Sequence, residues 1–255
     1  MAGRAMFPEG AALVVGGSGG IGRAVCLALA AEGCDVAFTY RSNKAAAGEL
    51  VEALEAQGLR ARSVALDLTD REAVRAAVDE VARDFGRLHT VVLAHGADIS
   101  MTYVAAIDDA EWDRTVAGDL TGAFNVIKAV IPHMRGQGGA FVAMSSAGLM
   151  RHPPKDILSL VPKAGIEAMM RGIAREEGRY GIRANSLALG VIDAGLFHRL
   201  EERLTPDFVE AMKRNTSLRR FGTAEEAADA AVFLASSRSA FITGQSIALD
   251  GGYSV

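Results

Sequence analysis

The stretch LVVGGSGGIGRA, residues 13–24, runs from an apolar segment through a cluster of glycines into a segment of helical character. Glycine adopts the positive φ angles of a tight strand-to-helix turn, and its missing side chain lets a ligand approach the backbone. The N–H groups at the start of such a helix favour an anion. The stretch therefore predicts a strand, a turn and a helix that hold the pyrophosphate of a dinucleotide, with a turn that binds nothing as the alternative. The predicted cofactor contacts are Gly16, Ser18, Gly19, Gly20, Ile21 and Gly22.

The residues after the second apolar run bear on which dinucleotide is bound. A site for NAD carries an acidic residue there for the ribose hydroxyls, whereas this chain has Tyr40, Arg41 and Ser42. A guanidinium binds a 2′-phosphate through two hydrogen bonds, and Arg23 adds a second positive charge near the glycines. The sequence thus favours NADP over NAD. The alternative is that both arginines are solvated surface residues.

The rest of the chain alternates short apolar runs with longer segments of helical period, which is typical of βα units around a buried parallel sheet. We therefore predict an α/β fold, a Rossmann-type doubly wound parallel sheet of about seven strands, in one domain over residues 1–255. Residues 194–215 depart from the alternation, and we expect one or two inserted helices that form a lid. The predicted strands are 11–15, 35–40, 62–66, 89–94, 140–145, 183–189 and 246–249, and the clearest helices are 21–31, 44–57, 70–85, 108–134, 160–180 and 224–236.

Composition narrows the partners. The 255 residues are 50% hydrophobic and 23% charged, with a formal net charge of −4. That balance gives no basic face for nucleic acid or an anionic membrane, and no apolar run approaches the length of a membrane span. No signal peptide is expected at the N-terminus. Cys26 and Cys34 are the two cysteines, and we interpret them as small apolar residues rather than as a disulfide. A cytoplasmic protein with no metal site is the expectation.

A second stretch, AMSSAGLMRHPPKDILSLVPKAG at residues 143–165, has the catalytic spacing of a known family. The chain resembles the short-chain dehydrogenase/reductase family from end to end, and is similar in pattern to 3-oxoacyl-acyl-carrier-protein reductases. In that family a Ser is followed thirteen positions later by a Tyr and four positions after that by a Lys. Counting from Ser146 gives Ser159 and Lys163, so a serine stands at the tyrosine position.

The resemblance implies further site residues, and several depart from the family pattern. Asp67 falls where an acidic residue meets the adenine amino group, and Lys163 would hold the ribose. Of the Asn-Asn-Ala-Gly turn after the fourth strand only Gly96 remains, with His95 before it. The catalytic Asn of the long fourth helix is Asp119. The Thr that binds the nicotinamide carboxamide becomes Ala194.

The serine at the tyrosine position changes the available chemistry. In relatives the tyrosine hydroxyl exchanges a proton with the substrate oxygen. A phenol has a pKa of about 10, whereas the pKa of an aliphatic alcohol is about 15.7. Ionising Ser159 would therefore cost roughly 8 kcal/mol more than ionising a tyrosine at that position. We expect Asp119 to favour the ammonium form of Lys163 and to pair with it; the alternative is an ordinary polar residue at a helix irregularity. His152 is the best substitute acid in sequence, with Lys155 beside it, unless that loop is only a rigid connector.

Three hypotheses about function follow. The first is an NADP-dependent carbonyl or alcohol oxidoreductase, acting on an oxoacyl thioester or a similar ketone with an atypical or impaired catalytic centre. The second is a catalytically inactive subunit that supports an active homologue in a hetero-oligomer, with no cofactor at all if the site is degenerate. The third, ranked last, is a lyase or dehydratase that uses Asp119 or His152. The resemblance also implies a homo- or hetero-oligomer, a tetramer or a dimer with a related subunit, and a small-molecule substrate that the sequence does not identify.

Overall fold

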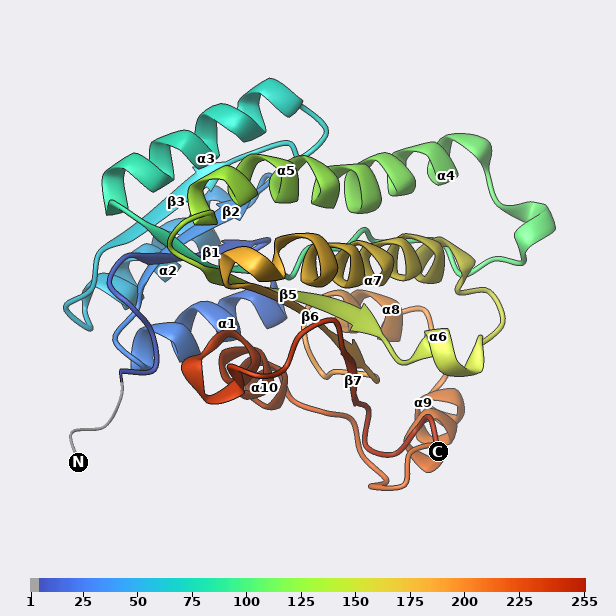
Figure 1. Cartoon of the computed structure of the whole chain (residues 1–255). Helices are drawn as coiled ribbons and strands as arrows, with labels where there is room; N and C mark the ends of the chain where they lie inside the picture. Colours follow the sequence, from blue (N-terminus) through green and yellow to red (C-terminus); the bar gives the residue numbers. More distant parts are fainter. Residues whose placement is uncertain (1–4) are drawn as a thin grey trace.

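The apolar runs of the sequence form one parallel sheet in the computed structural model, which describes residues 5–255 (Figure 1). The strand order is β3-β2-β1-β4-β5-β6-β7, so the direction of winding reverses between β1 and β4. Ligands of such sheets bind outside the carboxyl ends of the strands at that reversal. The predicted seven-stranded α/β fold is confirmed. The strands are β1 (Ala11–Val15), β2 (Asp35–Tyr40), β3 (Ala61–Ala65), β4 (Leu88–Leu93), β5 (Gly139–Ser146), β6 (Ile182–Leu189) and β7 (Ser246–Leu249).

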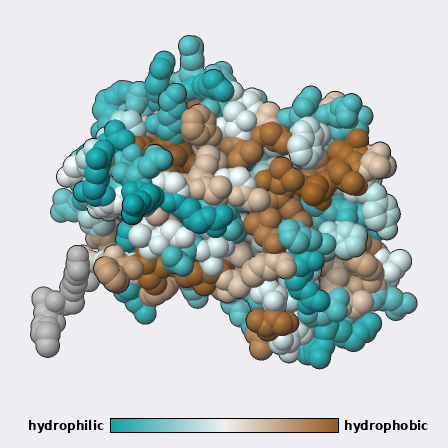
Figure 2. All heavy atoms as spheres, turned by 45° about the vertical axis from the view of Figure 1, so that its right-hand side comes forward, coloured by the Kyte–Doolittle hydropathy of each residue, from teal (hydrophilic) through white to brown (hydrophobic). Residues whose placement is uncertain are grey.

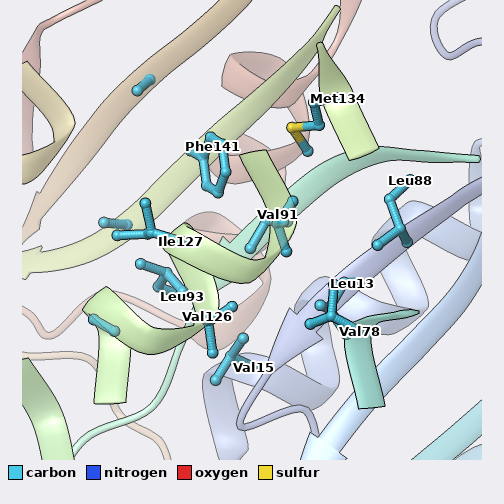
Figure 3. Packing of buried hydrophobic residues seen from close by; sticks show 14 of the residues in the cluster. Leu13, Val15, Val78, Leu88, Val91, Leu93, Val126, Ile127, Met134 and Phe141 are labelled. Atoms are coloured by element: carbon cyan, nitrogen blue, oxygen red, sulfur yellow. The ribbon is translucent and has the colours of Figure 1, made fainter. Parts of the chain in front are cut away.

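Helices cover both faces of the sheet and bury its apolar side chains in two clusters. One cluster lies under α3 (Arg71–Phe85), α5 (Gly122–Met134) and α7 (Ile157–Glu177), and Figure 3 shows part of it, including Val91, Val126 and Phe141. The other lies under α1 (Gly20–Ala31), α2 (Lys44–Glu55) and α10 (Ala224–Ala235). Strands covered on both faces are expected to be almost continuously apolar, as β1 is, and β4 is buried along its whole length.

Local signals end the helices where the sequence suggests. Gly33, Gly58, Gly86 and Gly181 all have positive φ angles between 75° and 81°, as expected of residues that close a helix in the left-handed conformation. At the other end, the Thr223 hydroxyl accepts a hydrogen bond from the Glu226 N–H and the Glu226 carboxylate accepts one from the Thr223 N–H. Such a capping box fixes the start of α10.

Two helices differ from the prediction. Residues 108–134 form α4 (Asp109–Thr115) and α5 with a π-helical turn, η2 (Val116–Thr121), between them, and Asp119 lies on that turn. The helix predicted from residue 160 begins at Ile157, so Pro162 lies inside α7 rather than in its first turn. A proline there leaves a carbonyl one turn earlier without its helical donor. Both departures lie beside the candidate active site.

The predicted insertion at 194–215 contains two helices, α8 (Leu196–Glu201) and α9 (Pro206–Arg214). They have a small core of their own, in which Phe197, Val209 and Phe221 are buried and the rings of Phe197 and Phe221 meet edge to face. The segment therefore packs as a unit over the end of the sheet. Its role as a lid stays a prediction.

Both cysteines are free and buried, as the sequence predicts. Burial raises the pKa of the Cys26 thiol far above its ordinary value and that of Cys34 to about 12, so both stay protonated near neutral pH. Across residues 5–255, the structure has no helix with the length and apolar character needed to cross a membrane.

Arg183 on β6 joins the C-terminal end of α10 to the sheet. Its guanidinium donates to three carbonyl oxygens at the end of that helix, those of Leu234, Ala235 and Ser236, at 2.8 to 3.0 Å. It also donates to the Ser239 hydroxyl and to the Ile242 carbonyl. The last carbonyls of a helix have no partner within it, so one side chain satisfies several groups that would otherwise be unpaired.

We expect Arg183→Met to lower the free energy of unfolding by about 3 kcal/mol, because it removes charged hydrogen bonds and leaves half-buried carbonyls unpaired. Chemical denaturation followed by circular dichroism measures this change. Arg75→Met on the exposed face of α3 is the control, with an expected change within about 0.5 kcal/mol. Equal stability of the two variants would contradict the role given to Arg183.

Candidate active site

The turn between β1 and α1 can be made only by glycines. Gly16 has a φ of +82°, and its N–H donates to the Thr39 hydroxyl of β2 at 3.1 Å. A Cβ on Gly17 would lie 2.4 Å from Cβ of Phe38, and one on Gly22 would lie 2.2 Å from the carbonyl oxygen of Gly16. Real Cβ atoms do not make such contacts. The turn is thereby pressed against the sheet.

The turn leaves the N-terminus of α1 open to an anion. Gly19 precedes the helix and no side chain caps it. The first N–H groups of an uncapped helix lack partners and attract negative charge. The backbone from Ser18 to Gly22, with the Ser18 hydroxyl, therefore fits a pyrophosphate, and its binding of a dinucleotide stays a prediction.

Arg41 and Asp67 follow the carboxyl ends of the neighbouring strands β2 and β3. Asp67 accepts hydrogen bonds from the N–H and the hydroxyl of Thr69, at 2.9 and 2.8 Å, which hold the pKa of its carboxyl below the ordinary value. The charge of Arg41 lowers that pKa further, so the two side chains are near each other. Both are exposed, and they form a polar end of the cleft suited to a nucleoside.

The segment before α8 lies directly on the start of α1. A Cβ on Gly20 would be 2.6 Å from the backbone nitrogen of Gly195 and 3.1 Å from Cβ of Ala194. Gly195 itself has a φ of +57°. The two glycines allow backbone to lie against backbone, and the methyl group of Ala194 lies beside the start of α1.

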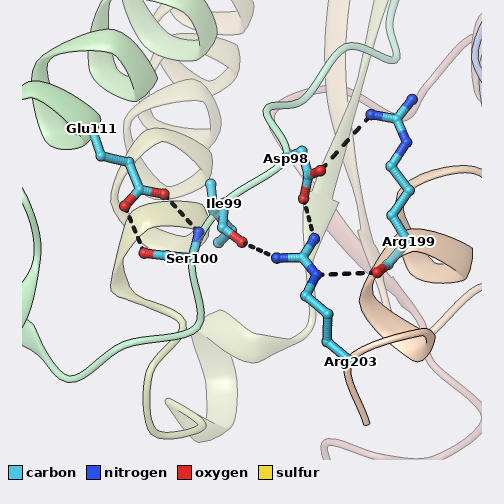
Figure 4. A network of polar contacts seen from close by, with 6 residues as sticks. All are labelled: Asp98, Ile99, Ser100, Glu111, Arg199 and Arg203. Atoms are coloured by element: carbon cyan, nitrogen blue, oxygen red, sulfur yellow. Dashed lines mark hydrogen bonds and ion pairs between the residues drawn. The ribbon is translucent and has the colours of Figure 1, made fainter.

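Ion pairs join the inserted segment to the loop after β4 (Figure 4). Arg203 donates to the Asp98 carboxylate at 2.6 Å and to the Ile99 carbonyl at 3.3 Å. On the other side of that loop, the N–H and hydroxyl of Ser100 both donate to Glu111 of α4 at 2.6 Å. The loop is thus tied to the insertion and to α4, although exposed pairs of this kind are individually weak.

The surface beside the carboxyl edge of the sheet is partly apolar. Figure 2 brings forward the side of the molecule that carries α4, α6 (Gly148–Arg151) and α9, and shows apolar patches between polar ones there. Exposed apolar side chains on this side include Val104, Met150 and Phe208, which are 72%, 49% and 54% exposed. Such a surface suits a substrate with a hydrocarbon part.

Lys163, His95 and Asp119 meet at the carboxyl end of β4. The Lys163 ammonium donates to the His95 carbonyl at 3.1 Å, and Nε2 of the His95 ring lies 3.0 Å from the carbonyl oxygen of Asp119. Burial lowers the pKa of Lys163, and burial together with the Lys163 charge lowers that of His95. His95 is therefore neutral near pH 7, and among residues 5–255 its Nδ1 is one of few buried side-chain nitrogens without a partner.

The predicted ion pair between Asp119 and Lys163 is wrong in its geometry. The Asp119 carboxylate, 7% exposed, accepts from the N–H of Ala97 at 3.2 Å, and none of the ion pairs in residues 5–255 joins it to Lys163. Its charge acts at longer range and only partly offsets the effect of burial on the lysine. The π-helical turn directs Asp119 toward the loop after β4, and Gly96 lies in the same loop, where a Cβ would be 4.0 Å from the Lys163 nitrogen.

A carboxyl group that sequence reasoning missed lies near both Ser146 and Ser159. The hydroxyl oxygen of Ser146 accepts from the N–H of Gly148 at 3.1 Å, which leaves its own proton free to donate. A Cβ on Gly148 would lie 3.0 Å from that oxygen and 3.3 Å from Oδ2 of Asp156. The Ser159 side chain lies near the same carboxyl group and favours its charged form. The sequence gives no reason to place Asp156 in the site, because an Asp before a helix is expected to cap that helix.

The structure does not bring His152 into this group. His152 ends α6 in a left-handed conformation with φ 48° and is exposed. In the described part of the chain, its ring makes no hydrogen bond to Ser146, Ser159 or Lys163. The predicted substitute acid therefore lies on the rim of the site.

The glycine turn lies where the strand order of the parallel sheet reverses, and Ser146 and Lys163 lie at the same edge. This arrangement defines a dinucleotide-binding α/β protein. Comparisons identify the class more closely. A family model described as "Enoyl-(Acyl carrier protein) reductase" matches residues 15–254. A 3-oxoacyl-[acyl-carrier-protein] reductase FabG of Staphylococcus aureus is 34% identical over 243 residues, which cover 94% of this chain and 96% of that protein. An A-factor type gamma-butyrolactone 1′-reductase of Streptomyces virginiae is 33% identical, with 96% and 95% covered.

Solved structures agree. A short-chain type dehydrogenase/reductase from Mycobacterium ulcerans has a TM-score of 0.90 at 33% identity, covering 98% of this chain and 91% of that one. A short chain dehydrogenase from Burkholderia cenocepacia J2315 in complex with NADP has a TM-score of 0.89 at 29% identity, covering 99% and 100%. The chain belongs to the short-chain dehydrogenase/reductase family and is similar to its 3-oxoacyl-acyl-carrier-protein reductases. Proteins of this family are NAD(P)-dependent oxidoreductases of small molecules and are usually oligomeric.

Replacing glycine by alanine should have opposite effects on the free energy of unfolding in the turn and in α2. Gly22→Ala should lower the free energy of unfolding by about 2 kcal/mol, because its Cβ would meet a backbone oxygen. Gly48→Ala on α2 should raise it by about 0.5 to 1 kcal/mol, because a Cβ there meets nothing within 4 Å and alanine favours the helix. Thermal melting of both variants measures the difference. A neutral Gly22→Ala would show that the turn is not closely packed.

Proposed function

We propose that the chain is an NADP-dependent carbonyl reductase that acts on a 3-oxoacyl thioester or a similar ketone. The observation that carries the proposal is the retained nucleotide cleft, in which the uncapped start of α1 faces a lysine fixed by the carboxyl end of β4. The names of the curated relatives support the substrate class, since several are 3-oxoacyl-[acyl-carrier-protein] reductases. The NADP-bound structure of a relative supports the cofactor.

The preference for NADP rests on charge at the end of β2. Arg41 is exposed there and has no hydrogen-bonded partner within the part of the chain that the structure describes. Arg23, on the first turn of α1, is also exposed. A free guanidinium suits a 2′-phosphate, and this strand end has no carboxylate to bind the two ribose hydroxyls of NAD.

Other residues have distinct tasks in the proposed reaction. The nicotinamide, when bound, supplies hydride to the carbonyl carbon. The free hydroxyl proton of Ser146 binds and orients the substrate oxygen. Lys163 holds the ribose and raises the positive potential of the cleft. Residues 194–215 close the cleft against water, and Asp98 stabilises that closure through Arg203.

The second candidate is a catalytically inactive subunit that binds NADP and assembles with an active homologue. The observation that favours it is the loss of a phenol at Ser159 and of a hydroxyl group at Ala194, where relatives have tyrosine and threonine. The edge strand β7 is available for assembly, since Ser246, Ile247 and Ala248 are exposed. In this case a hetero-oligomer, rather than the homo-oligomer of the first candidate, is the working form.

Turnover by the purified chain decides between the candidates. Homogeneous protein should oxidise NADPH in the presence of an acetoacetyl thioester. The loss of the absorbance of the reduced nicotinamide measures this turnover. A chain that binds NADPH but is inert alone, and gains activity only with a co-purifying homologue, would replace the first candidate by the second. A chain that does not bind NADPH would overturn the first candidate and leave only an inactive subunit without a cofactor. Ser159→Tyr should not restore full turnover by itself, because Asp119 and Ala194 remain.

Arg41→Ala should weaken NADPH binding by about ten- to a hundred-fold while leaving NADH binding within about two-fold, because it removes charged hydrogen bonds to the 2′-phosphate alone. Fluorescence titration with each nucleotide measures the two affinities. Arg83→Ala in the last turn of α3, at the other end of that helix from Asp67, is the matched control. An equal loss for NADPH and NADH would mean that Arg41 does not read the 2′-phosphate.

A further inference from the structure

The Asp156 carboxyl group lies near the Ser146 hydroxyl. A Cβ placed on Gly148 would be 3.0 Å from the Ser146 hydroxyl oxygen and 3.3 Å from Oδ2 of Asp156, with Cδ2 of Leu160 at 2.8 Å on the same side. The Ser159 side chain, in the first turn of α7, lies near the same carboxyl group and favours its charged form. The two groups are therefore close enough that a carbonyl oxygen bound by Ser146 would be within reach of Asp156, directly or through one water.

The carboxyl group has no structural task that would account for this placement. Asp156 stands at the N-cap position of α7, yet its side chain makes no capping hydrogen bond and its backbone, at φ −105° and ψ 15°, lies outside the extended region usual for a cap. Only its carbonyl oxygen serves the helix, by accepting from the N–H groups of Ser159 and Leu160. The side chain is free to act in the cleft.

The side chains around Asp156 are mostly apolar, or are charged groups that contact other residues. Leu158 and Leu160 are buried beside it. Of the charged neighbours in the same loop, Arg151 donates to the Tyr253 carbonyl at 2.8 Å, and the Lys155 ammonium lies 5.0 Å from the centre of the Tyr103 ring. His152 is exposed. No ion pair to Asp156 occurs within residues 5–255.

This environment sets the protonation of Asp156. Burial raises the pKa of its carboxyl to about 6, and the Ser159 side chain opposes that rise. A half-buried carboxylic acid that titrates near the working pH is suited to donate and recover a proton. The loop that holds it is itself unusual, because His152 and Lys155 are two of the three non-glycine residues with positive φ in the described chain.

We propose that the Asp156 carboxyl group exchanges the proton with the substrate oxygen, in place of the phenol that the chain lacks. The proposal rests on the reductase function proposed above. In reduction, Asp156 in its acid form breaks its O–H bond and gives the proton to the carbonyl oxygen as hydride reaches the carbonyl carbon. The product is the alcohol, and the aspartate left behind takes up one proton from water. Ser159 positions the carboxyl group, and in oxidation of the alcohol Asp156 is the base.

The other candidates for this proton transfer fit less well. Lys163 already donates to the His95 carbonyl. The His95 ring faces the Asp119 carbonyl. Ser159 has the right position but would have to ionise as an aliphatic alcohol, at a cost that a carboxyl group avoids. Asp156 alone combines a titratable group with a place beside Ser146.

Asp156→Asn should lower kcat for ketone reduction by about a hundred-fold or more and change KM by less than about three-fold, because the amide keeps the shape and loses the acid. Wild-type kcat should fall about tenfold per pH unit above pH 6, and this dependence should be absent in Asp156→Asn. Asp229→Asn, an exposed carboxylate of α10 on the other face of the sheet, should behave as wild type. Asp156→Glu should recover part of the activity.

Ser159→Ala provides a measurement that a structural role would not affect. Removing the hydroxyl group that favours the charged form should raise the pKa of Asp156 and move the break in the pH profile to higher pH. An unmoved break would show that the titrating group is not Asp156.

Stability tests the same carboxyl group without any cofactor. The pKa of Asp156 in the folded chain is above the ordinary value, so its contribution to stability is present in acid and is lost as pH rises to about 6. Asp156→Asn should therefore melt several degrees above wild type at pH 8 and close to it at pH 4.5. Equal melting at both pH values would overturn the assigned burial and titration of Asp156.

The outcomes separate this proposal from the function on which it rests. An inert wild-type chain would remove the reductase function. An active wild-type chain whose Asp156→Asn variant keeps full kcat and the same pH profile would leave the reductase function intact and overturn the role of Asp156.

Discussion

All seven strands of the sheet run in one direction, and this constraint brings every carboxyl end to the same edge. The end of β1 continues into the glycine turn, the end of β4 supplies the His95 carbonyl that holds Lys163, and the end of β5 supplies Ser146. Parallel strands must be joined by crossovers, so helices cover both faces and the core fixes these three positions relative to one another. The cleft is a consequence of strand direction rather than of any single contact.

The two ends of the cleft are held by different forces. Backbone fit fixes the nucleotide end, where a side chain on Gly17 or Gly22 would meet atoms at 2.4 or 2.2 Å. The catalytic end depends on side chains that project from completed elements, and Ser159 is only half-buried. A change of side chain there costs little folding energy, whereas a change in the turn disturbs the sheet. This difference explains how the phenol can be absent from an otherwise intact frame.

The sheet, the turn and the inserted helices could be predicted from the hydrophobic periodicity and the positions of glycines. These elements depend on local conformational preferences of the backbone. The rest depends on where side chains point. The sequence gives no sign of the π-helical turn that directs Asp119 to Ala97 instead of Lys163. Pro162 suggested a helix start near residue 160, but α7 begins at Ile157. Asp156 resembles an ordinary cap in sequence, and only the structure shows its carboxyl group turned toward Ser146.

The two buried thiols are expected to react slowly with alkylating reagents. The thiolate is the form that reacts with alkylating reagents, and burial keeps Cys26 and Cys34 protonated and shielded. A cysteine introduced at an exposed position such as Phe208 of α9 would therefore be the one readily alkylated thiol. A fluorescent dye could be attached there without first removing the native cysteines, and movement of the inserted helices could be followed by its emission.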